Sequence, residues 1–282
     1  MEGGYEPFYR ISSLVSAKDL QQPLAQAVEW GADAVESWQT LSEEPQQFDK
    51  MSLVLRNDEV IGWWWPHDED IVEGTTVGDT TEALPHSMML SSNSTFYDIA
   101  DAFARRQHFL FFVLDGTEIT GTISYLNLFS RTGQLCLLSL TFLLETVTED
   151  LCMLAAELCW KTLSDGRKQI AQQVCDVRFK PSQRDDQAPP NEIRWEYLIR
   201  STTFVDKGTM LARSGLLPTI SNTELKSVFA RAEKVRNLCA HAANEQELII
   251  ELPRKKFAGF LHRTLDLVET IKLKTHALGS TV

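Results

Sequence analysis

The spacing of apolar residues changes near residue 130, and this change limits the chain to a fold of two different parts. Before it, short runs with the alternation typical of strands are mixed with helical segments, whereas almost every later segment has apolar residues at helical spacing. We therefore predict an α+β protein with an α/β part over residues 1–130 and an all-α helical bundle over residues 131–282. A chain of 282 residues is long enough for two such domains.

Helices and strands of the first part occur in an order that appears twice. The predicted elements are a helix at Leu20–Leu41, a hairpin of Met51–Leu55 and Val60–Trp65, a helix at Thr95–Gln107, and strands at His108–Leu114 and Glu118–Ser124. The last two strands are joined across Asp115-Gly116, a dipeptide typical of tight hairpins. This order predicts an internal repeat, with one copy in residues 1–72 and the other in residues 73–130.

The second strand of each copy ends in a string that begins with glycine. The two strings are Gly62-Trp63-Trp64-Trp65-Pro66-His67-Asp68 and Gly121-Thr122-Ile123-Ser124-Tyr125-Leu126-Asn127. We expect Ser124 to end its strand and Asn127 to lie in the first turn of the next helix, where such groups can bind phosphate or ribose. Two other interpretations stay open: Ser124 as a simple helix N-cap and Asn127 as a surface residue. The three tryptophans are typical of strand packing, or else of a base-stacking platform.

These strings, and the order of elements before them, resemble a tandem pair of CBS domains, in which the hairpin ends in G-h-h-[ST]-x-x-D. The resemblance implies that Ser124 and Asn127 are ligand positions for a regulatory adenine nucleotide, with Asn127 where Asp is usual. Asp68 is the counterpart in the first copy, where Trp65 replaces the hydroxyl residue. The first copy is thus degenerate, which implies one working nucleotide site.

The second part is predicted to be a bundle of long helices. We expect them at Tyr125–Leu163, Glu192–Leu216, Asn222–Asn244 and Phe257–Leu273, with a polar, proline-containing loop at Arg178–Glu192. Glu145 and Glu149 lie four residues apart on the first helix and therefore share a face. They are predicted either to orient an Arg or a His or to be solvated.

An arginine and a histidine five positions apart occur in the segment Arg236-Asn237-Leu238-Cys239-Ala240-His241. A histidine that titrates near neutrality can take the proton of a ribose 2′-hydroxyl or deliver one to the leaving 5′-oxygen, while an arginine neutralises charge on the phosphate. On a helix, however, residues five apart lie roughly 140° from each other around the axis. For both groups to act on one phosphodiester, one of three conditions must hold. The Arg236 side chain reaches around the helix, the helix is distorted there, or two chains each contribute one of the groups.

The segment resembles the mark of the HEPN superfamily, R-x4-6-H on a late helix of a small all-α domain, commonly with Asn, Asp or His after the Arg. The resemblance covers roughly residues 131–282, and Arg236, Asn237 and His241 occupy the catalytic positions. It implies a homodimeric endoribonuclease that requires no cofactor and leaves 2′,3′-cyclic phosphate and 5′-hydroxyl ends on its RNA substrate. The other interpretation of these residues is a capped or salt-bridged surface helix.

Charge is distributed unevenly along the chain. The net charge is −12, but residues 225–282 carry 10 Lys and Arg against 6 Asp and Glu, a local +4, so residues 1–224 carry −16. An overall acidic chain is not typical of a protein that coats nucleic acid, and RNA contacts are therefore expected on the C-terminal helices. Arg231, Lys234 and the run Arg254-Lys255-Lys256 are the predicted phosphate contacts, with a solvated cluster as the alternative for the run.

Several classes of protein are disfavoured by the sequence. The five cysteines are an odd number without C-x-x-C spacing, which disfavours a disulfide framework and a zinc site, and the histidines show no metal-ligand spacing. The apolar run at residues 135–147 is too short to span a bilayer, and the first ten residues do not resemble a signal peptide. We expect a cytoplasmic protein without a metal site or a membrane segment.

Together, these patterns predict a CBS-like α/β pair that senses a nucleotide, followed by an all-α HEPN-like bundle that cuts RNA across a homodimer interface. The alternative is a non-catalytic nucleotide-sensing or adaptor protein, in which the bundle serves dimerisation and partner binding. A third hypothesis makes the bundle one half of a toxin–antitoxin or phage-defence pair.

Overall fold

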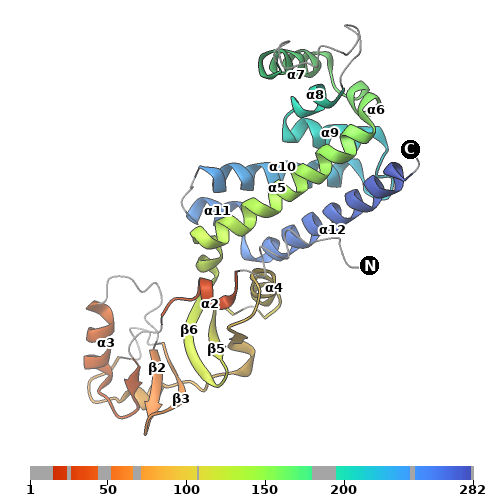
Figure 1. Cartoon of the computed structure of the whole chain (residues 1–282). Coiled ribbons are helices and arrows are strands. Elements are labelled where there is room, and N and C mark those ends of the chain that lie inside the picture. The colour runs from red at the N-terminus through yellow and green to blue at the C-terminus, as the bar shows by residue number, and fades with distance from the viewer. Residues whose placement is uncertain are drawn as a thin grey trace. The chain divides into compact units, whose positions relative to one another are not determined.

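The chain divides into two compact units, Ser16–Asn127 and a second unit that begins at Leu128. The computed structural model describes residues 15–23, 27–43, 52–65, 71–106, 108–179, 195–241 and 245–280. The first unit contains two small sheets with short helices, and the described part of the second contains only helices (Figure 1). The observed class is α+β, as predicted.

Two three-stranded sheets of identical topology form the N-terminal unit. The first copy consists of β1 (Val28–Glu29), α3 (Ala34–Glu43), β2 (Ser52–Arg56) and β3 (Glu59–Trp64), and the second of β4 (Met89–Ser91), α4 (Phe96–Arg106), β5 (Leu110–Asp115) and β6 (Glu118–Ser124). In each copy the first pair of strands is parallel and the second is antiparallel, with one irregularity in register. The copies therefore share the order strand, helix, strand, strand.

Local chemistry explains both hairpins. Asn57 and Asp58 have φ of 55° and 61°, and Gly116 has φ of 63°. Positive φ at the turn matches the right-handed twist of the strands that it joins, and Asn, Asp and Gly are the residues that tolerate it. This is why the hairpins lie close to the positions predicted from the sequence.

A capped helical turn from outside each copy completes its sheet. The turn α2 (Ala17–Leu20) leads to Gln22, which bridges to Thr122 on β6, and the 3₁₀ turn η2 (Val77–Thr80) leads to Glu82, which bridges to Trp63 on β3. The segment before the first copy thus packs on the second copy, and the segment between the copies packs on the first.

The predicted helix at Leu20–Leu41 is wrong for its first half. α2 ends at Leu20, and Val28 and Glu29 form β1, which pairs with β2. Pro23 has no backbone N–H to donate to a helix, and Gly31 lowers helix propensity further. Helical structure resumes only with α3 at Ala34.

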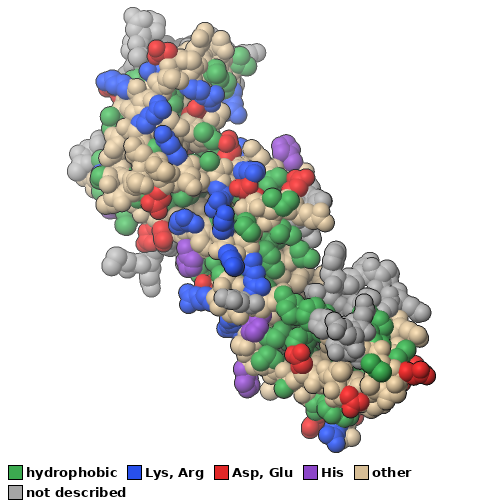
Figure 2. Space-filling view, turned by 180° about the vertical axis from the view of Figure 1, so that it is seen from behind, with side chains coloured by type: hydrophobic (Ala, Val, Ile, Leu, Met, Phe, Trp, Pro, Cys, Tyr) green, Lys and Arg blue, Asp and Glu red, His purple; other side chains and the backbone are tan. Residues whose placement is uncertain are grey.

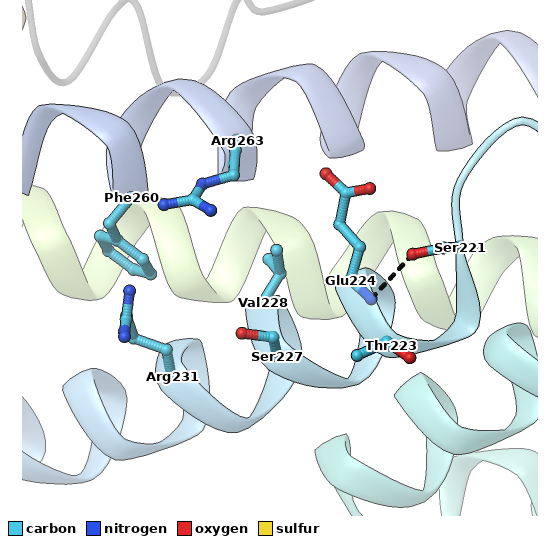
Figure 3. Close-up of a pocket in the computed structure, with 8 residues that line it drawn as sticks. All are labelled: Ser221, Thr223, Glu224, Ser227, Val228, Arg231, Phe260 and Arg263. Atoms are coloured by element: carbon cyan, nitrogen blue, oxygen red, sulfur yellow. Dashed lines mark hydrogen bonds between the residues drawn. The ribbon is translucent and has the colours of Figure 1, made fainter. Parts of the chain in front are cut away.

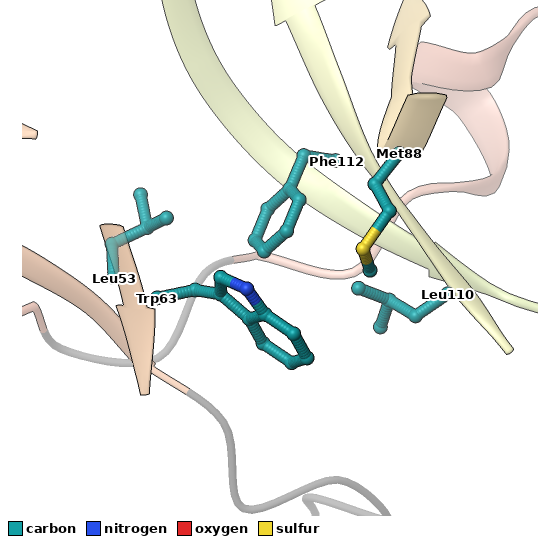
Figure 4. Close-up of a cluster of buried hydrophobic side chains, with 5 residues drawn as sticks. All are labelled: Leu53, Trp63, Met88, Leu110 and Phe112. Carbon is teal, nitrogen blue, oxygen red and sulfur yellow. The ribbon is translucent and has the colours of Figure 1, made fainter. Parts of the chain in front are cut away.

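Side chains from both sheets form the core of this unit. Leu53 and Trp63 from the first sheet contact Met88, Leu110 and Phe112 from the second copy (Figure 4). A second cluster lies around Trp64, which also donates from its indole N–H to Thr80 Oγ1 at 2.8 Å. Trp63 is 5% exposed and Trp64 1%, so these two rings serve strand packing and offer no face to a base.

Substitution of Gly121 by Ala is expected to destabilise the N-terminal unit by about 1–3 kcal/mol, because the new Cβ would lie 2.5 Å from the backbone oxygen of Gln22. Gly31→Ala is the matched control: nothing lies within 4 Å of its Cβ position, and its φ is not positive. Urea unfolding of both variants measures the difference. Equal free energies of unfolding would contradict the described contact between β6 and residue 22.

The helical unit is arranged around one long central helix. Its helices are α5 (Arg131–Leu154), α6 (Ala156–Lys161), α7 (Asp165–Arg178), α8 (Trp195–Arg200), α9 (Phe204–Ser214), α10 (Asn222–Ala240), α11 (Glu245–Glu251) and α12 (Arg254–Gly279). α5 contacts α8, α9, α10 and α12. A bidentate ion pair joins α7 to α9, with Arg167 Nε and Nη2 at 2.7 Å and 2.6 Å from the two carboxylate oxygens of Asp206.

Two of the predicted long helices are divided. Residues 125–129 form the 3₁₀ helix η4 (Tyr125–Phe129), and α5 begins separately after its N-cap Ser130. The predicted helix at Glu192–Leu216 is divided before Thr203, because this residue caps α9 by accepting from the backbone N–H of Asp206. The sequence did not predict α7 or α11, and residues 180–192 of the predicted loop lie outside the described residues.

Candidate functional site

α10 carries both groups of the Arg/His segment and presents them to different sides. Ser221 begins the helix by accepting from the backbone N–H of Glu224, and His241 ends it as the C-cap residue, with its backbone N–H donating to Asn237 O. The helix is regular through Arg236. The two side chains therefore lie roughly 140° apart around its axis, as expected from the sequence.

Arg236 is turned toward α5 and α9. Its Nη1 donates to Glu145 Oε2 at 2.6 Å, and its guanidinium carbon lies 5.8 Å from the centre of the Phe204 ring. The side chain is 28% exposed. Glu145 thus orients an arginine, one of the two roles predicted for it, and part of the guanidinium still faces solvent.

A buried lysine links this arginine to a longer network of charges. Lys207 on α9 is bracketed by the two glutamates of α5, with Nζ 2.6 Å from Glu149 Oε2 and 3.9 Å from Glu145 Oε1. Its side chain is only 3% exposed. On the far side, Glu149 lies 3.6 Å from Arg200 Nε. A buried charge is stable only with such partners, so the network fixes the position of Glu145 and through it that of Arg236.

His241 and Asn237 lie on the exposed side of α10. Both side chains are exposed, and they are four residues apart, so they share a face of the helix. Among the described residues, no side chain hydrogen-bonds to the His241 imidazole. Cys239, between them, is buried, and burial raises the pKa of its thiol to about 12, which keeps it protonated and unsuited as a nucleophile.

The basic residues predicted to contact phosphate have mixed environments. Lys234 and Arg231 both approach Glu251, at 2.5 Å and 3.8 Å, while Lys255 and Lys256 at the start of α12 are exposed. On the face shown in Figure 2, Lys and Arg side chains gather over the helical unit. The sequence had given no sign of Glu251 as a partner, because it lies on a short helix that was not predicted.

In the second copy of the repeat, Ser124 and Asn127 bind each other. The backbone N–H and the hydroxyl of Ser124 both donate to Asn127 Oδ1, at 2.6 Å and 2.9 Å. Because a backbone N–H can only donate, the amide oxygen must face Ser124, and the Nδ2 group points away. Ser124 ends β6 and Asn127 lies in η4, as predicted, and the pair forms a cap around the start of η4.

The first copy differs at the equivalent place. Trp65 is half-buried and packs on Phe109, with ring centres 4.5 Å apart, so an aromatic ring fills the position of Ser124. Asp68, the predicted counterpart of Asn127, lies outside the described residues. The ring at residue 65 is consistent with a degenerate first copy.

The described residues contain no group of three or more His, Cys, Asp or Glu side chains able to hold a metal ion. All five cysteines are buried and free. None of the described helices is both long enough and apolar enough to cross a membrane.

Comparison with known proteins gives only remote similarities. No model of a protein family matches the chain, and no curated protein matches it. The chain is similar to the CBS domain of a bacterial CNNM/CorC family Mg2+ transporter in complex with ATP, at 16% identity and a TM-score of 0.34, over 44% of this chain and 94% of that chain. It is also similar to another CBS domain, at 14% identity and a TM-score of 0.32, over 40% of this chain and 94% of that chain. These TM-scores are too low to support an argument about fold or ligand.

Proposed function

We propose that this protein is a metal-independent endoribonuclease in which Arg236 of one protomer and His241 of its partner form the site, and that its repeat unit binds a regulatory adenine nucleotide. The observation that carries the proposal is the environment of Arg236. Glu145 and Phe204 hold the guanidinium in one place while part of it faces solvent. A cation fixed in advance stabilises a transition state better than a mobile one.

The chemistry needs only these residues. His241 takes the proton of the ribose 2′-hydroxyl, the 2′-oxygen attacks the phosphorus, and the bond from phosphorus to the 5′-oxygen breaks. The proton returns from His241 to the 5′-oxygen, leaving a 2′,3′-cyclic phosphate and a 5′-hydroxyl. Arg236 neutralises the charge on the non-bridging oxygens, and the exposed amide of Asn237 donates to one of them.

The helix geometry supports a homodimer. Arg236 and His241 lie on different sides of α10, so one phosphate is poorly placed to contact both groups of the same chain. A second copy related by two-fold symmetry supplies the missing group. This argument supports the composite site and not a site within one protomer.

Incubation of the purified protein with mixed RNA in EDTA tests the activity. We expect cleavage to persist without divalent metal and the products to carry a 2′,3′-cyclic phosphate, which blocks ligation at the 3′ end until the ring is opened and the phosphate is removed. Products with 5′-phosphate ends, or cleavage that stops in EDTA, would contradict the mechanism.

The alternative function, a non-catalytic sensor or adaptor, has one observation in its favour. The ion pair of Arg236 with Glu145 is sufficient by itself to explain the arginine as a structural residue. Nucleotide binding without any RNA cleavage in the same preparation would favour this alternative, and with it a partner-binding role such as that in a toxin–antitoxin or phage-defence pair.

The nucleotide proposal makes a prediction about Asn127. Asn127 is 8% exposed, and its Nδ2, which points away from Ser124, is a donor where the usual Asp offers an acceptor to the ribose hydroxyls. Asn127→Asp should therefore strengthen adenosine binding by about 1 kcal/mol, roughly fivefold. Calorimetric titration with adenosine and AMP measures this. Asp98→Asn is the matched control, because Asp98 makes the same cap with Thr95 at the start of α4. Absence of binding to both wild type and Asn127→Asp would refute the site.

A further inference from the structure

A groove between α10 and α12 lies outside the Arg236 and His241 segment. It encloses about 350 Å³ and is lined by Arg231 of α10, by Ser221, which caps that helix, and by Phe260 and Arg263 of α12. Figure 3 shows the guanidinium groups of Arg231 and Arg263 extending toward the Phe260 ring from the two helices. This volume is at the lower end of the range for ligand pockets and exceeds that of a single phosphate.

Two cations dominate the groove. Arg263 is exposed, and the only hydrogen bond it makes within the described ranges runs from Nε to Gly259 O at 2.9 Å, which leaves its terminal nitrogens available. Arg231 shares Glu251 with Lys234 and lies at the longer of the two distances, 3.8 Å. Glu224 is the one carboxylate in the lining, so the groove carries a net positive charge.

Hydroxyl groups add to this positive charge. Thr223 and Ser227 lie one turn apart at the start of α10, and neither side chain has a hydrogen-bond partner among the described residues. The N-terminus of the 19-residue helix α10, which carries the positive end of the helix dipole, lies beside these hydroxyls. Two guanidinium groups with free hydroxyls suit the oxygens of a phosphate.

The groove does not offer a base-binding surface. Phe260 is 3% exposed, so its ring presents no face on which a base could stack. Contacts with the sugar–phosphate backbone position a nucleic-acid strand on a protein without recognising its base sequence. The chemistry therefore favours a phosphodiester backbone over a free nucleotide.

The position of the groove on α10 connects it to His241. Arg231 and Lys234 are three residues apart, and Lys234 and His241 are seven apart, so the three side chains follow one face of the helix. At 1.5 Å per residue, Arg231 and His241 are about 15 Å apart along the axis, roughly four stacked nucleotides.

We propose that the groove between α10 and α12 binds the backbone of single-stranded RNA on one side of the cleaved phosphodiester, with Arg231 and Arg263 as its phosphate contacts. The proposal rests on the proposed function for the identity of the ligand. Binding and cleavage are nevertheless separable, because neither arginine takes part in the chemistry.

Fluorescence anisotropy with a labelled single-stranded RNA of roughly 16 nucleotides tests the groove. The full chain carries His241→Ala as background, so that the RNA stays intact. Arg231→Gln and Arg263→Gln are each expected to raise the Kd about fivefold to tenfold and to lower the slope of log K against log salt by about 0.7. Glu224→Gln removes the opposing carboxylate and is expected to lower the Kd about twofold to threefold.

Lys161→Gln on α6 is the matched control, because it removes an exposed cation far along the chain from the groove. It should leave the Kd unchanged. Circular dichroism melts of all variants show that the fold is kept. If Arg231→Gln and Arg263→Gln have the same Kd as Lys161→Gln, the proposal that the groove binds RNA is wrong.

The two proposals fail in different ways. If the wild-type protein cuts no RNA but binds it through Arg231 and Arg263, the RNA-binding groove is supported and the ribonuclease function is refuted. If the wild-type protein cuts RNA while Arg231→Gln and Arg263→Gln have the same Kd as Lys161→Gln, the ribonuclease function is supported and the RNA-binding groove is refuted. If no RNA binds to the full chain, the groove is refuted.

Discussion

His241→Ala is expected to lower the rate of RNA cleavage by roughly 10³-fold. A positioned general base or acid contributes about 10²–10⁴ to such a rate, and no other histidine among the described residues lies on α10. Single-turnover cleavage of labelled RNA in EDTA measures the effect. His276→Ala is the matched control, because this exposed histidine lies in the last turn of α12.

Arg236→Ala is expected to reduce cleavage by a similar factor, about 10²–10³, because it removes the fixed cation that stabilises the phosphate in the proposed mechanism. Arg236→Lys should recover only a small part of the rate, since an ammonium group keeps the charge but loses the planar fork that can contact Glu145 and a phosphate at the same time. A full rate in Arg236→Lys would indicate that charge alone matters and that the orientation by Glu145 does not.

Mixing the two inactive variants tests the composite site. When Arg236→Ala and His241→Ala chains are mixed equally, half of the dimers contain one chain of each kind, and each such dimer keeps one intact site. About a quarter of the wild-type activity should therefore return. No recovery after complete exchange of subunits would contradict a site shared between two chains.

The parts of the fold that follow from neighbouring residues were predictable from the sequence. Asn57-Asp58 and Asp115-Gly116 specify tight turns by themselves, and the hairpins occur there. β1 and β4 were not predicted, because strands of two and three residues carry almost no pattern and form only by pairing with β2 and β5. The capped turns that complete each sheet were missed for the same reason.

In the candidate site, too, the features set by neighbouring residues were predictable from the sequence, and those set by distant residues were not. The spacing of Arg236 and His241 predicted that they would lie on different sides of a helix, and that of Glu145 and Glu149 predicted a shared face. Lys207 was missed because its burial depends on helices far apart in the sequence. A lysine in an amphipathic helix gives no local signal of whether it will be exposed.

Lys207→Met is expected to destabilise the helical unit by about 3 kcal/mol. Methionine keeps the apolar stem packed but leaves Glu145 and Glu149 without the cation between them. Arg236 and Arg200 still contact these two carboxylates, which keeps the loss near the lower end for a broken buried pair. Differential scanning calorimetry should show a fall in Tm of roughly 6–12 °C for a unit of this size.

Lys161→Met is the matched control for burial. Lys161 Nζ lies 2.6 Å from Glu157 Oε1, the same distance as in the pair of Lys207 and Glu149, but its side chain is 70% exposed against 3% for Lys207. Screening by water should leave the free energy of unfolding of this variant close to that of the wild type. A double variant, Lys207→Met with Glu149→Gln, should recover part of the stability, because it also removes the negative charge of Glu149 that Lys207→Met leaves without its partner. If Lys207→Met costs no more than Lys161→Met, the buried network does not hold Glu145 in place, and another cause must be found for the fixed position of Arg236.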